Sequence, residues 1–254
     1  MTTTSISVCI PARNEAANVG SLVSAVIDHP QATEVLVLDH ASIDDTARIA
    51  GDAGAQVIDA DSVLAQFGPA LGKGDVLWRS VEVARGDIVV WLDADLRSYT
   101  PDYLTSLAQP LLANPKITLV KPDYTRTLNG KPTGGGRITE RIAKPMLRAL
   151  HPHLAHIRQP LAGEYAIRRE AARTLPFEID YGVEVGLLID VASKYGTEAI
   201  AEVTLPPRVH RNRPDTELAE PSRQVLRTTR SRAGLAEQNT RPPLASIGNA
   251  VAYA

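Results

Sequence analysis

The sequence contains little cysteine and has no long apolar run. Cys9 is the one cysteine among 254 residues, which excludes a disulfide within the chain and a metal cluster held by cysteines alone. No window reaches the roughly 18 consecutive apolar residues of a membrane-spanning helix. Residues 1–5 lack the basic and apolar stretches of a secretory signal. We therefore expect a cytoplasmic protein without a membrane span, with Cys9 as inert core.

The chain also lacks an excess of charge of one sign. Its net charge of −2 argues against a protein whose whole surface binds nucleic acid or a membrane. It leaves room for a local basic pocket. With 44% hydrophobic residues, the chain is long enough to bury a full core in one compact unit.

Short apolar runs alternate with longer segments of helical period. This pattern predicts an α/β fold in which a mostly parallel, Rossmann-like sheet is flanked by helices. Strands are expected at residues 5–10, 34–38, 56–58, 87–92, 118–121 and 199–205, and helices at 16–28, 42–51, 74–84, 102–113 and 183–195. Ser42 or Asp45 is expected to cap the second of these helices. Ligands of such a sheet gather at the carboxyl ends of its strands.

The most informative segment is Asp93-Ala94-Asp95, which follows a hydrophobic strand. Two carboxylates at this spacing can share Mg²⁺ or Mn²⁺, and the ion can neutralise a bound diphosphate. A plain turn is the alternative, because turns after strands are rich in aspartate. The flanking sequence favours a donor site for a nucleotide sugar.

Other strand ends carry polar groups that suit such a donor. The turn after the first strand has no glycine before Gly20, so a nicotinamide site is not expected. Glu15 and Asp39 could instead accept hydrogen bonds from a uracil or ribose, or cap helices. Lys73, between two glycines, could contact the donor phosphate or base, although a solvated turn is the alternative and no P-loop pattern is present.

The combination of motifs resembles the GT-A glycosyltransferases. The first motifs are Pro11-Ala-Arg-Asn-Glu15, Asp39-x-x-Ser42-x-Asp44, Gly72-Lys-Gly74 and Asp93-Ala-Asp95. Residues 134–140, 159–165, 181–190 and 209–214 narrow the resemblance to the glucosyl-3-phosphoglycerate synthases, a retaining family of actinobacteria. The resemblance runs from about residue 5 to 235. It departs at His40, where the family has a small residue, and in shorter terminal extensions.

The resemblance implies a transferase that moves glucose from UDP-glucose, or another nucleoside diphosphate glucose, to the 2-hydroxyl of 3-phosphoglycerate. It implies a homodimer that uses Mg²⁺ or Mn²⁺, with Asp95 and His210 as metal ligands and Glu184, Asp95 and Lys73 as catalytic residues. The expected donor-binding residues are Pro11, Ala12, Arg13, Glu15, Asp39, His40, Lys73, Asp93, Ala94 and Asp95. The expected acceptor-binding residues are Gly136, Arg137, Thr139, Leu161, Tyr181, Arg208 and Asn212.

The residues around the expected acceptor site agree with that assignment. Three glycines at 134–136, followed by Arg137 and Thr139, offer backbone N–H groups, a guanidinium and a hydroxyl to one anion. A flexible loop before a capped helix is the alternative. For His210, an exposed polar side chain is the alternative to a metal ligand.

We divide the chain into a donor-binding half at residues 1–125, an acceptor-binding half at 126–234 and a C-terminal extension at 235–254. The extension is expected to be loose or to form an oligomer contact. Two other functions stay open: a GT-A transferase with another sugar donor or phosphorylated acceptor, and a nucleotide-sugar sensor without catalytic activity.

Overall fold

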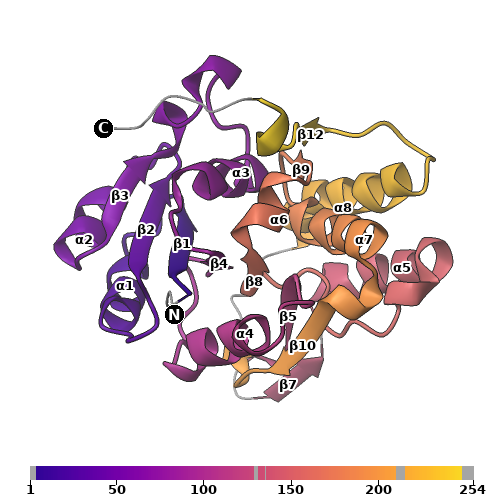
Figure 1. Cartoon of the computed structure of the whole chain (residues 1–254), viewed down its shortest axis with the longest axis horizontal. Helices are drawn as coiled ribbons and strands as arrows, with labels where there is room; N and C mark the ends of the chain where they lie inside the picture. The colour runs from indigo at the N-terminus through magenta and orange to yellow at the C-terminus, as the bar shows by residue number, and fades with distance from the viewer. Residues whose placement is uncertain (1–3, 129–130, 135, 210–214, 248–254) are drawn as a thin grey trace.

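The computed structural model in Figure 1 describes residues 4–128, 131–134, 136–209 and 215–247. The strands are β1 (Ile6–Ala12), β2 (Glu34–Asp39), β3 (Gln56–Asp59), β4 (Ile88–Trp91), β5 (Leu119–Asp123), β6 (Arg126–Leu128), β7 (Lys131–Gly134), β8 (Tyr165–Arg168), β9 (Phe177–Glu178), β10 (Ile200–Thr204), β11 (Arg208–Val209) and β12 (Thr240–Arg241). The α-helices are α1 (Val19–Ile27), α2 (Thr46–Asp52), α3 (Lys73–Val83), α4 (Asp102–Ala113), α5 (Lys144–Leu150), α6 (Arg169–Arg173), α7 (Val183–Tyr195) and α8 (Ala219–Arg232).

Seven of the described strands form the central sheet, in the order β10-β5-β8-β4-β1-β2-β3. All neighbours pair in parallel except β8, which runs antiparallel to β4 and β5. The carboxyl ends of the parallel strands therefore lie at the same edge as the start of β8. The expected mostly parallel α/β sheet is confirmed.

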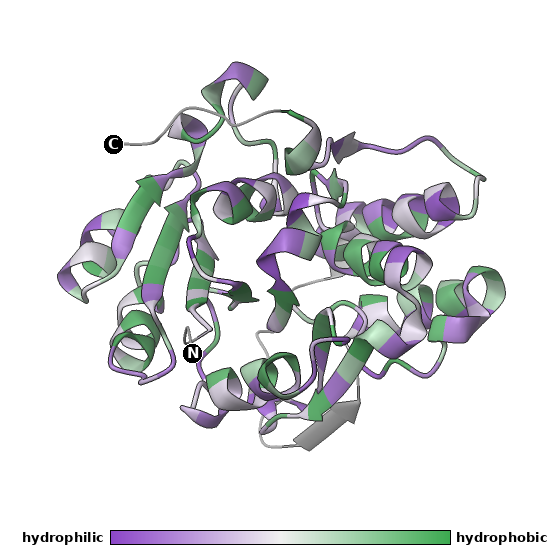
Figure 2. Ribbon diagram, viewed as in Figure 1, coloured by the Kyte–Doolittle hydropathy of each residue, from purple (hydrophilic) through white to green (hydrophobic). Residues whose placement is uncertain are grey.

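Helices cover both faces of this sheet, because its central strands are apolar on both sides. In β1, Ile6, Val8 and Ile10 pack in a core with α1 and α4. Cys9 points to the opposite face and packs in a core with α3 and α7. Figure 2 shows the apolar residues along these strands. Burial raises the pKa of the Cys9 thiol, in agreement with an inert core residue.

The expected elements of the first half lie within a few residues of their observed bounds, and the largest difference is at α2. This helix begins at Thr46, because the side chain of Ser42, which was expected to start it, binds a neighbouring loop instead. The Ser42 hydroxyl accepts a hydrogen bond from Asn14 N at 2.9 Å, and Asp44 Oδ2 accepts one from Ala16 N at 3.2 Å. Neither Ser42 nor Asp45 caps α2 through its side chain.

The C-terminal segment is not loose as far as residue 247. Strand β12 pairs with β9, and Trp78 Nε1 on α3 donates a hydrogen bond to Pro242 O at 2.9 Å. Arg241 forms an ion pair of 2.6 Å with the buried Asp75 carboxylate. Composition alone predicted a loose tail because it does not record these partners, which lie between 62 and 166 positions away in the chain. An oligomer contact by this segment stays a prediction.

Candidate active site

Charged side chains converge where the strands of the central sheet end. Asp93 and Asp95 follow β4, Arg126 follows β5 and Arg208 follows β10, while Glu164 directly precedes the antiparallel β8. Parallel strands bring these residues from distant segments to one edge of the sheet. The site is therefore a product of topology as much as of local sequence.

Lys73 joins two carboxylates at this edge. Its Nζ lies 2.7 Å from Asp93 Oδ1 and 2.6 Å from Glu184 Oε1. Burial disfavours the charge of Lys73, but the carboxylates of Asp93 and Glu184 raise its pKa well above the usual value. Burial likewise opposes ionisation of Asp93, yet Lys73 and Arg208 hold its pKa well below the usual range. Lys73 is thus cationic and Asp93 anionic at neutral pH.

The first turn of α3 fixes the position of Lys73 by close backbone contact. A Cβ on Gly74 would lie 1.9 Å from Glu178 O, so only glycine allows α3 to approach β9 this closely. Asp75 N donates a hydrogen bond to Ile179 O at 3.1 Å across the same contact. The glycine after Lys73 is therefore required by packing and does not mark a solvated turn.

Arg208 forms ion pairs with three carboxylates. Its Nη2 lies 3.1 Å from Asp93 Oδ2, 3.2 Å from Asp95 Oδ1 and 2.8 Å from Glu164 Oε1. Its own burial opposes the charge, but these carboxylates raise the pKa of Arg208. A permanent cation therefore lies beside the Asp93-Ala94-Asp95 segment.

A larger cleft of about 420 Å³ lies on one side of these charges. It is lined by nine expected donor-binding residues: Pro11, Ala12, Arg13, Glu15, His40, Lys73, Asp93, Ala94 and Asp95. Asp39 is not among its lining residues, and its Oδ1 is buried without a hydrogen-bond partner among the described residues. The ring of His40 donates from Nε2 to Ala70 O at 2.9 Å, which anchors the turn before Gly72.

A smaller cleft of about 190 Å³ adjoins the larger one. It is lined by six expected acceptor-binding residues: Gly136, Arg137, Thr139, Leu161, Tyr181 and Arg208. Lys73, Asp93, Asp95 and Tyr181 line both clefts, and Glu184 lines the smaller one. The two expected sets of binding residues thus meet at the charged cluster. Asn212 and His210 lie outside the described residues.

The donor atoms at the junction of the clefts suit a hard divalent cation. Asp93 and Asp95 present carboxylates there, with side chains 21% and 27% exposed, and oxygen ligands are preferred by Mg²⁺ and Mn²⁺. Within the described ranges, no three His, Cys, Asp or Glu side chains are grouped to hold a metal.

Sequence reasoning missed Arg126, which also lines the smaller cleft. It also missed the buried residues Lys121 and Tyr124, which support the site. The position of Arg126 after a parallel strand was a signal in the sequence. Glu164 lies within the segment 159–165 that carries the resemblance, directly before β8.

Gly163 packs against Asp93 and offers a test of this geometry. An added Cβ would lie 2.3 Å from both Asp93 carboxylate oxygens, so Gly163→Ala must displace Asp93 from Lys73. We expect kcat to fall about 10- to 100-fold, since small displacements at reacting groups have effects of this order. Steady-state kinetics would measure kcat of this variant. The control is Gly51→Ala, whose added Cβ makes an ordinary contact with Val57 at 3.8 Å. Wild-type kcat in Gly163→Ala would contradict the proposed geometry.

Lys121 is a fully buried lysine beneath the site. Its Nζ donates a hydrogen bond to Ala162 O at 2.9 Å and lies 4.3 Å from the centre of the Tyr165 ring. Burial lowers the pKa of Lys121 to about 8, against the attraction of Glu184. The hydrogen bond from Lys121 to Ala162 O holds the turn that carries Leu161 and Gly163.

The pKa of Lys121 predicts a pH-dependent stability. In the unfolded chain a lysine has a pKa of about 10.4, so between the two values the unfolded chain binds more protons and the free energy of unfolding rises with pH. From about pH 7 to about pH 10, we expect the free energy of unfolding of the wild type to gain about 2 kcal/mol relative to Lys121→Met. Urea denaturation at both pH values measures this, and a difference that does not change with pH would contradict it.

Comparisons with known proteins agree with this geometry. Residues 7–175 match the model of glycosyl transferase family 2. The chain is 44% identical over 239 residues to a glucosyl-3-phosphoglycerate synthase of Mycolicibacterium paratuberculosis, an alignment that covers 91% of this chain and 73% of that protein.

Solved structures of the Mycobacterium tuberculosis glucosyl-3-phosphoglycerate synthase are similar to the whole described fold. The complex with Mn²⁺, UDP and glucosyl-3-phosphoglycerate has a TM-score of 0.89 and 40% identity, and covers 96% of this chain and 92% of that one. The complex with Mn²⁺, UDP-glucose and phosphoglyceric acid has a TM-score of 0.89 and 41% identity, and covers 96% and 91%. In the described part of this chain, no helix has the length and apolar character to cross a membrane.

Proposed function

The chain belongs to glycosyl transferase family 2, and from this premise we propose that it transfers glucose from UDP-glucose to the 2-hydroxyl of 3-phosphoglycerate. The observation that carries the proposal is the junction of the two clefts at Lys73, Asp93 and Asp95. A sugar donor in the larger cleft would present its anomeric carbon to an acceptor in the smaller one. The ligands of the similar M. tuberculosis structures support this choice of donor and acceptor.

The charged cluster would perform the transfer without a covalent intermediate. The acceptor hydroxyl attacks the anomeric carbon as the bond to the diphosphate breaks, and its proton passes to the departing phosphate oxygen. Lys73 would stabilise the negative charge that develops there. Glu184 is buried beside Lys73 and would orient the acceptor hydroxyl or bind a glucose hydroxyl.

The metal site fits the same reaction. Asp95 and His210 would hold Mg²⁺ or Mn²⁺, and the Mn²⁺ in the similar structures supports this proposal. When bound, the ion supplies positive charge to the diphosphate.

Acceptor binding would use the basic wall of the smaller cleft. Gly136, Arg137 and Thr139 would bind the acceptor phosphate, with Asn212 nearby. A Cβ on Gly136 would lie 3.6 Å from Thr139 Oγ1, so the backbone and this hydroxyl line one corner. Residues 1–125 would then bind mainly the donor and residues 126–234 the acceptor. A homodimer, which the resemblance implies, stays a prediction that light scattering would test.

Release of UDP from UDP-glucose tests the proposed function. The assay contains Mn²⁺ or Mg²⁺ and is run with and without 3-phosphoglycerate. We expect release that depends on 3-phosphoglycerate and on the metal. Tight binding of UDP-glucose without release would support the sensor alternative, and release with a different phosphorylated acceptor would replace 3-phosphoglycerate.

A further inference from the structure

Lys121 is a buried cation to which the proposed mechanism gives no role. Its side chain on β5 is fully buried, and burial lowers its pKa to about 8. The lysine is still mostly protonated at neutral pH, so burying its charge destabilises the fold. A methionine would fill a similar volume without that cost. The charge of Lys121 therefore calls for an explanation other than packing.

Strand alternation places Lys121 behind the charged cluster. Leu119 packs in the core with α3 and α7, and Val120 packs on the opposite face of the sheet. Because successive side chains of a strand point to opposite faces, Lys121 returns to the face of α3 and α7. Lys73 begins α3, and Glu184 lies in the first turn of α7. Lys121 is thus on the same side of the sheet as the ion pair between these two residues.

Tyr165 lies beside Lys121 and has an unexplained polar group of its own. The Lys121 ammonium lies 4.3 Å from the centre of the Tyr165 ring and donates a hydrogen bond to Ala162 O at 2.9 Å. The Tyr165 hydroxyl is buried and has no hydrogen-bond partner among the described residues. A buried hydroxyl without a partner is unfavourable, so this group also indicates a role beyond packing.

Both groups respond to the charge of Glu184. Burial lowers the pKa of Lys121 and raises that of Tyr165, and after burial Glu184 has the largest effect on each pKa and raises both. Lys73 is one cation between two carboxylates, at 2.7 Å from Asp93 and 2.6 Å from Glu184. Lys121 supplies a second cation on the same side of the sheet. The charged groups around Lys121 are Glu184 on α7, Lys73 on α3, Glu164 before β8, Asp93 after β4 and its register partner Glu202 on β10.

Lys121 also holds a second part of the active site. Its hydrogen bond to Ala162 O fixes the turn that precedes β8. Leu161 of this turn lines the smaller cleft. A Cβ on Gly163 would lie 2.3 Å from the Asp93 carboxylate oxygens, so the turn also sets where Asp93 lies. One ammonium group thus lies behind two parts of the site, this turn and the first turn of α7.

We propose that Lys121 is a positioning residue for the transfer, in which its ammonium and the Tyr165 hydroxyl hold Glu184 in place relative to the turn at 161–163. The proposal rests on the proposed function and adds to it two residues that line neither of the two clefts. It requires the charged form of Lys121, because the neutral amine cannot offset the charge of Glu184.

Replacement of Lys121 by an apolar residue of similar length tests the proposal. Lys121→Met should lower kcat about 30-fold at about pH 7, since small displacements of reacting groups have effects of this order. The affinity for UDP should change less than about 3-fold, which shows that the larger cleft is folded. A kcat within about 3-fold of the wild type would overturn the proposal.

Lys194→Met is the matched control, because Lys194 makes the same two kinds of contact at the opposite end of α7 from the site. Its Nζ donates a hydrogen bond to Thr174 O at 3.2 Å and lies 5.5 Å from the centre of the Tyr195 ring. The kcat of this variant should equal that of the wild type.

A milder pair of variants tests the hydroxyl alone. Tyr165→Phe should lower kcat about 10-fold, the effect of one hydrogen bond to a charged group. Tyr195→Phe, which loses a contact with Thr174 Oγ1 at 2.9 Å, should leave kcat unchanged. An unchanged kcat in Tyr165→Phe would overturn the role of this hydroxyl.

The pH dependence of kcat separates positioning by charge from packing. Lys121 loses its proton above about pH 8, so the wild type should lose its advantage over Lys121→Met there. The ratio of the two kcat values should fall from about 30 at about pH 7 to less than about 5 at about pH 9.5. Groups that titrate in both proteins cancel in this ratio. A ratio that does not change with pH would overturn the proposal.

NMR spectroscopy of isotope-labelled lysine side chains tests the link to Glu184 without turnover. Lys121→Met identifies the signal of Lys121, and Lys194 serves as an internal reference. The pKa of Lys121 should fall in Glu184→Gln, because Glu184 raises it in the wild type. An unchanged pKa would overturn the proposal. If the wild type forms no glucosylated product, the proposed function is wrong, whereas this titration still decides whether Lys121 and Glu184 act together.

Discussion

Asp95→Asn is expected to lower kcat by about a thousandfold, because it would remove an ionic ligand from the metal site proposed at the junction of the two clefts. Asp95 lines both clefts and lies 3.2 Å from Arg208 Nη2. An amide of the same size binds a hard divalent cation far less well than a carboxylate. Loss of charge stabilisation by the metal is worth several kcal/mol, which corresponds to about three powers of ten in rate.

The matched control for Asp95→Asn is Asp45→Asn. Asp45 is exposed and forms a surface ion pair with Arg48 at 2.9 Å. Its replacement should leave kcat unchanged. Steady-state UDP release at saturating substrates measures both variants. If Asp95→Asn keeps more than about a tenth of the wild-type kcat, Asp95 is not the metal ligand that the proposed mechanism requires.

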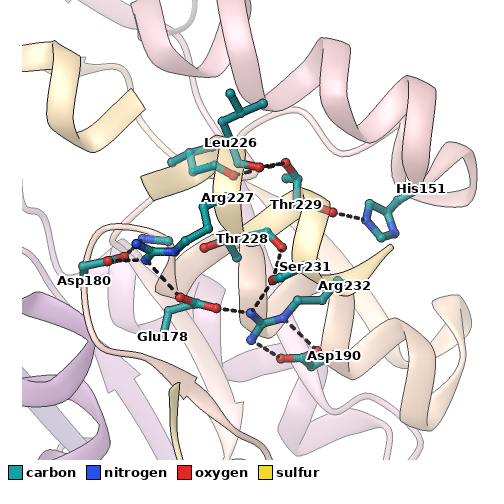
Figure 3. Close-up of polar contacts among 12 residues, drawn as sticks. His151, Glu178, Asp180, Asp190, Leu226, Arg227, Thr228, Thr229, Ser231 and Arg232 are labelled. Carbon is teal, nitrogen blue, oxygen red and sulfur yellow. Dashed lines mark hydrogen bonds and ion pairs between the residues drawn. The ribbon is translucent and has the colours of Figure 1, made fainter. Parts of the chain in front are cut away.

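The second large effect concerns the free energy of unfolding and helix α8, which contributes lining residues to both clefts. Figure 3 shows the buried ion pairs that join α8 to β9 and α7. Glu178 is fully buried and pairs with Arg232 and, at 3.3 Å, with Arg227. In Glu178→Ala, Arg232 keeps Asp190 at 3.0 Å but loses its other buried partner. We expect the free energy of unfolding to fall by about 3–5 kcal/mol, the usual effect of breaking a buried ion pair.

The control for Glu178→Ala is Glu220→Ala, which changes a residue of α8 itself. Its carboxylate pairs with Arg223 at 2.6 Å, but both side chains are at least 60% exposed. Its loss should change the free energy of unfolding by less than about 1 kcal/mol. Urea denaturation followed by circular dichroism compares the two. Equal values for both variants would show that the network in Figure 3 does not anchor α8.

Much of the lining of the larger cleft could be predicted from the sequence because its signals are local. Apolar runs located the parallel strands, and the polar residues directly after them, Asp93 and Asp95 above all, line the larger cleft. Helix α4 has the predicted bounds, because its apolar period and its ends are both written in consecutive residues.

The parts that could not be predicted depend on distant pairing. Arg126 and Arg208 become neighbours only because β6 and β11 pair in parallel across 82 positions. The start of α2 was predicted wrongly because Ser42 binds Asn14 of another loop instead of capping its own helix. In each case the side chain has a partner that lies far away in the chain.

The structure of the reaction product tests the central claim most directly. The chain is incubated with UDP-glucose, 3-phosphoglycerate and Mn²⁺, and the product is analysed by NMR spectroscopy. We predict a glucose residue linked through its anomeric carbon to the 2-oxygen of 3-phosphoglycerate, with the configuration of the donor retained. Free glucose, or glucose on any other group of the acceptor, would contradict the arrangement in which the two clefts meet at Lys73, Asp93 and Asp95.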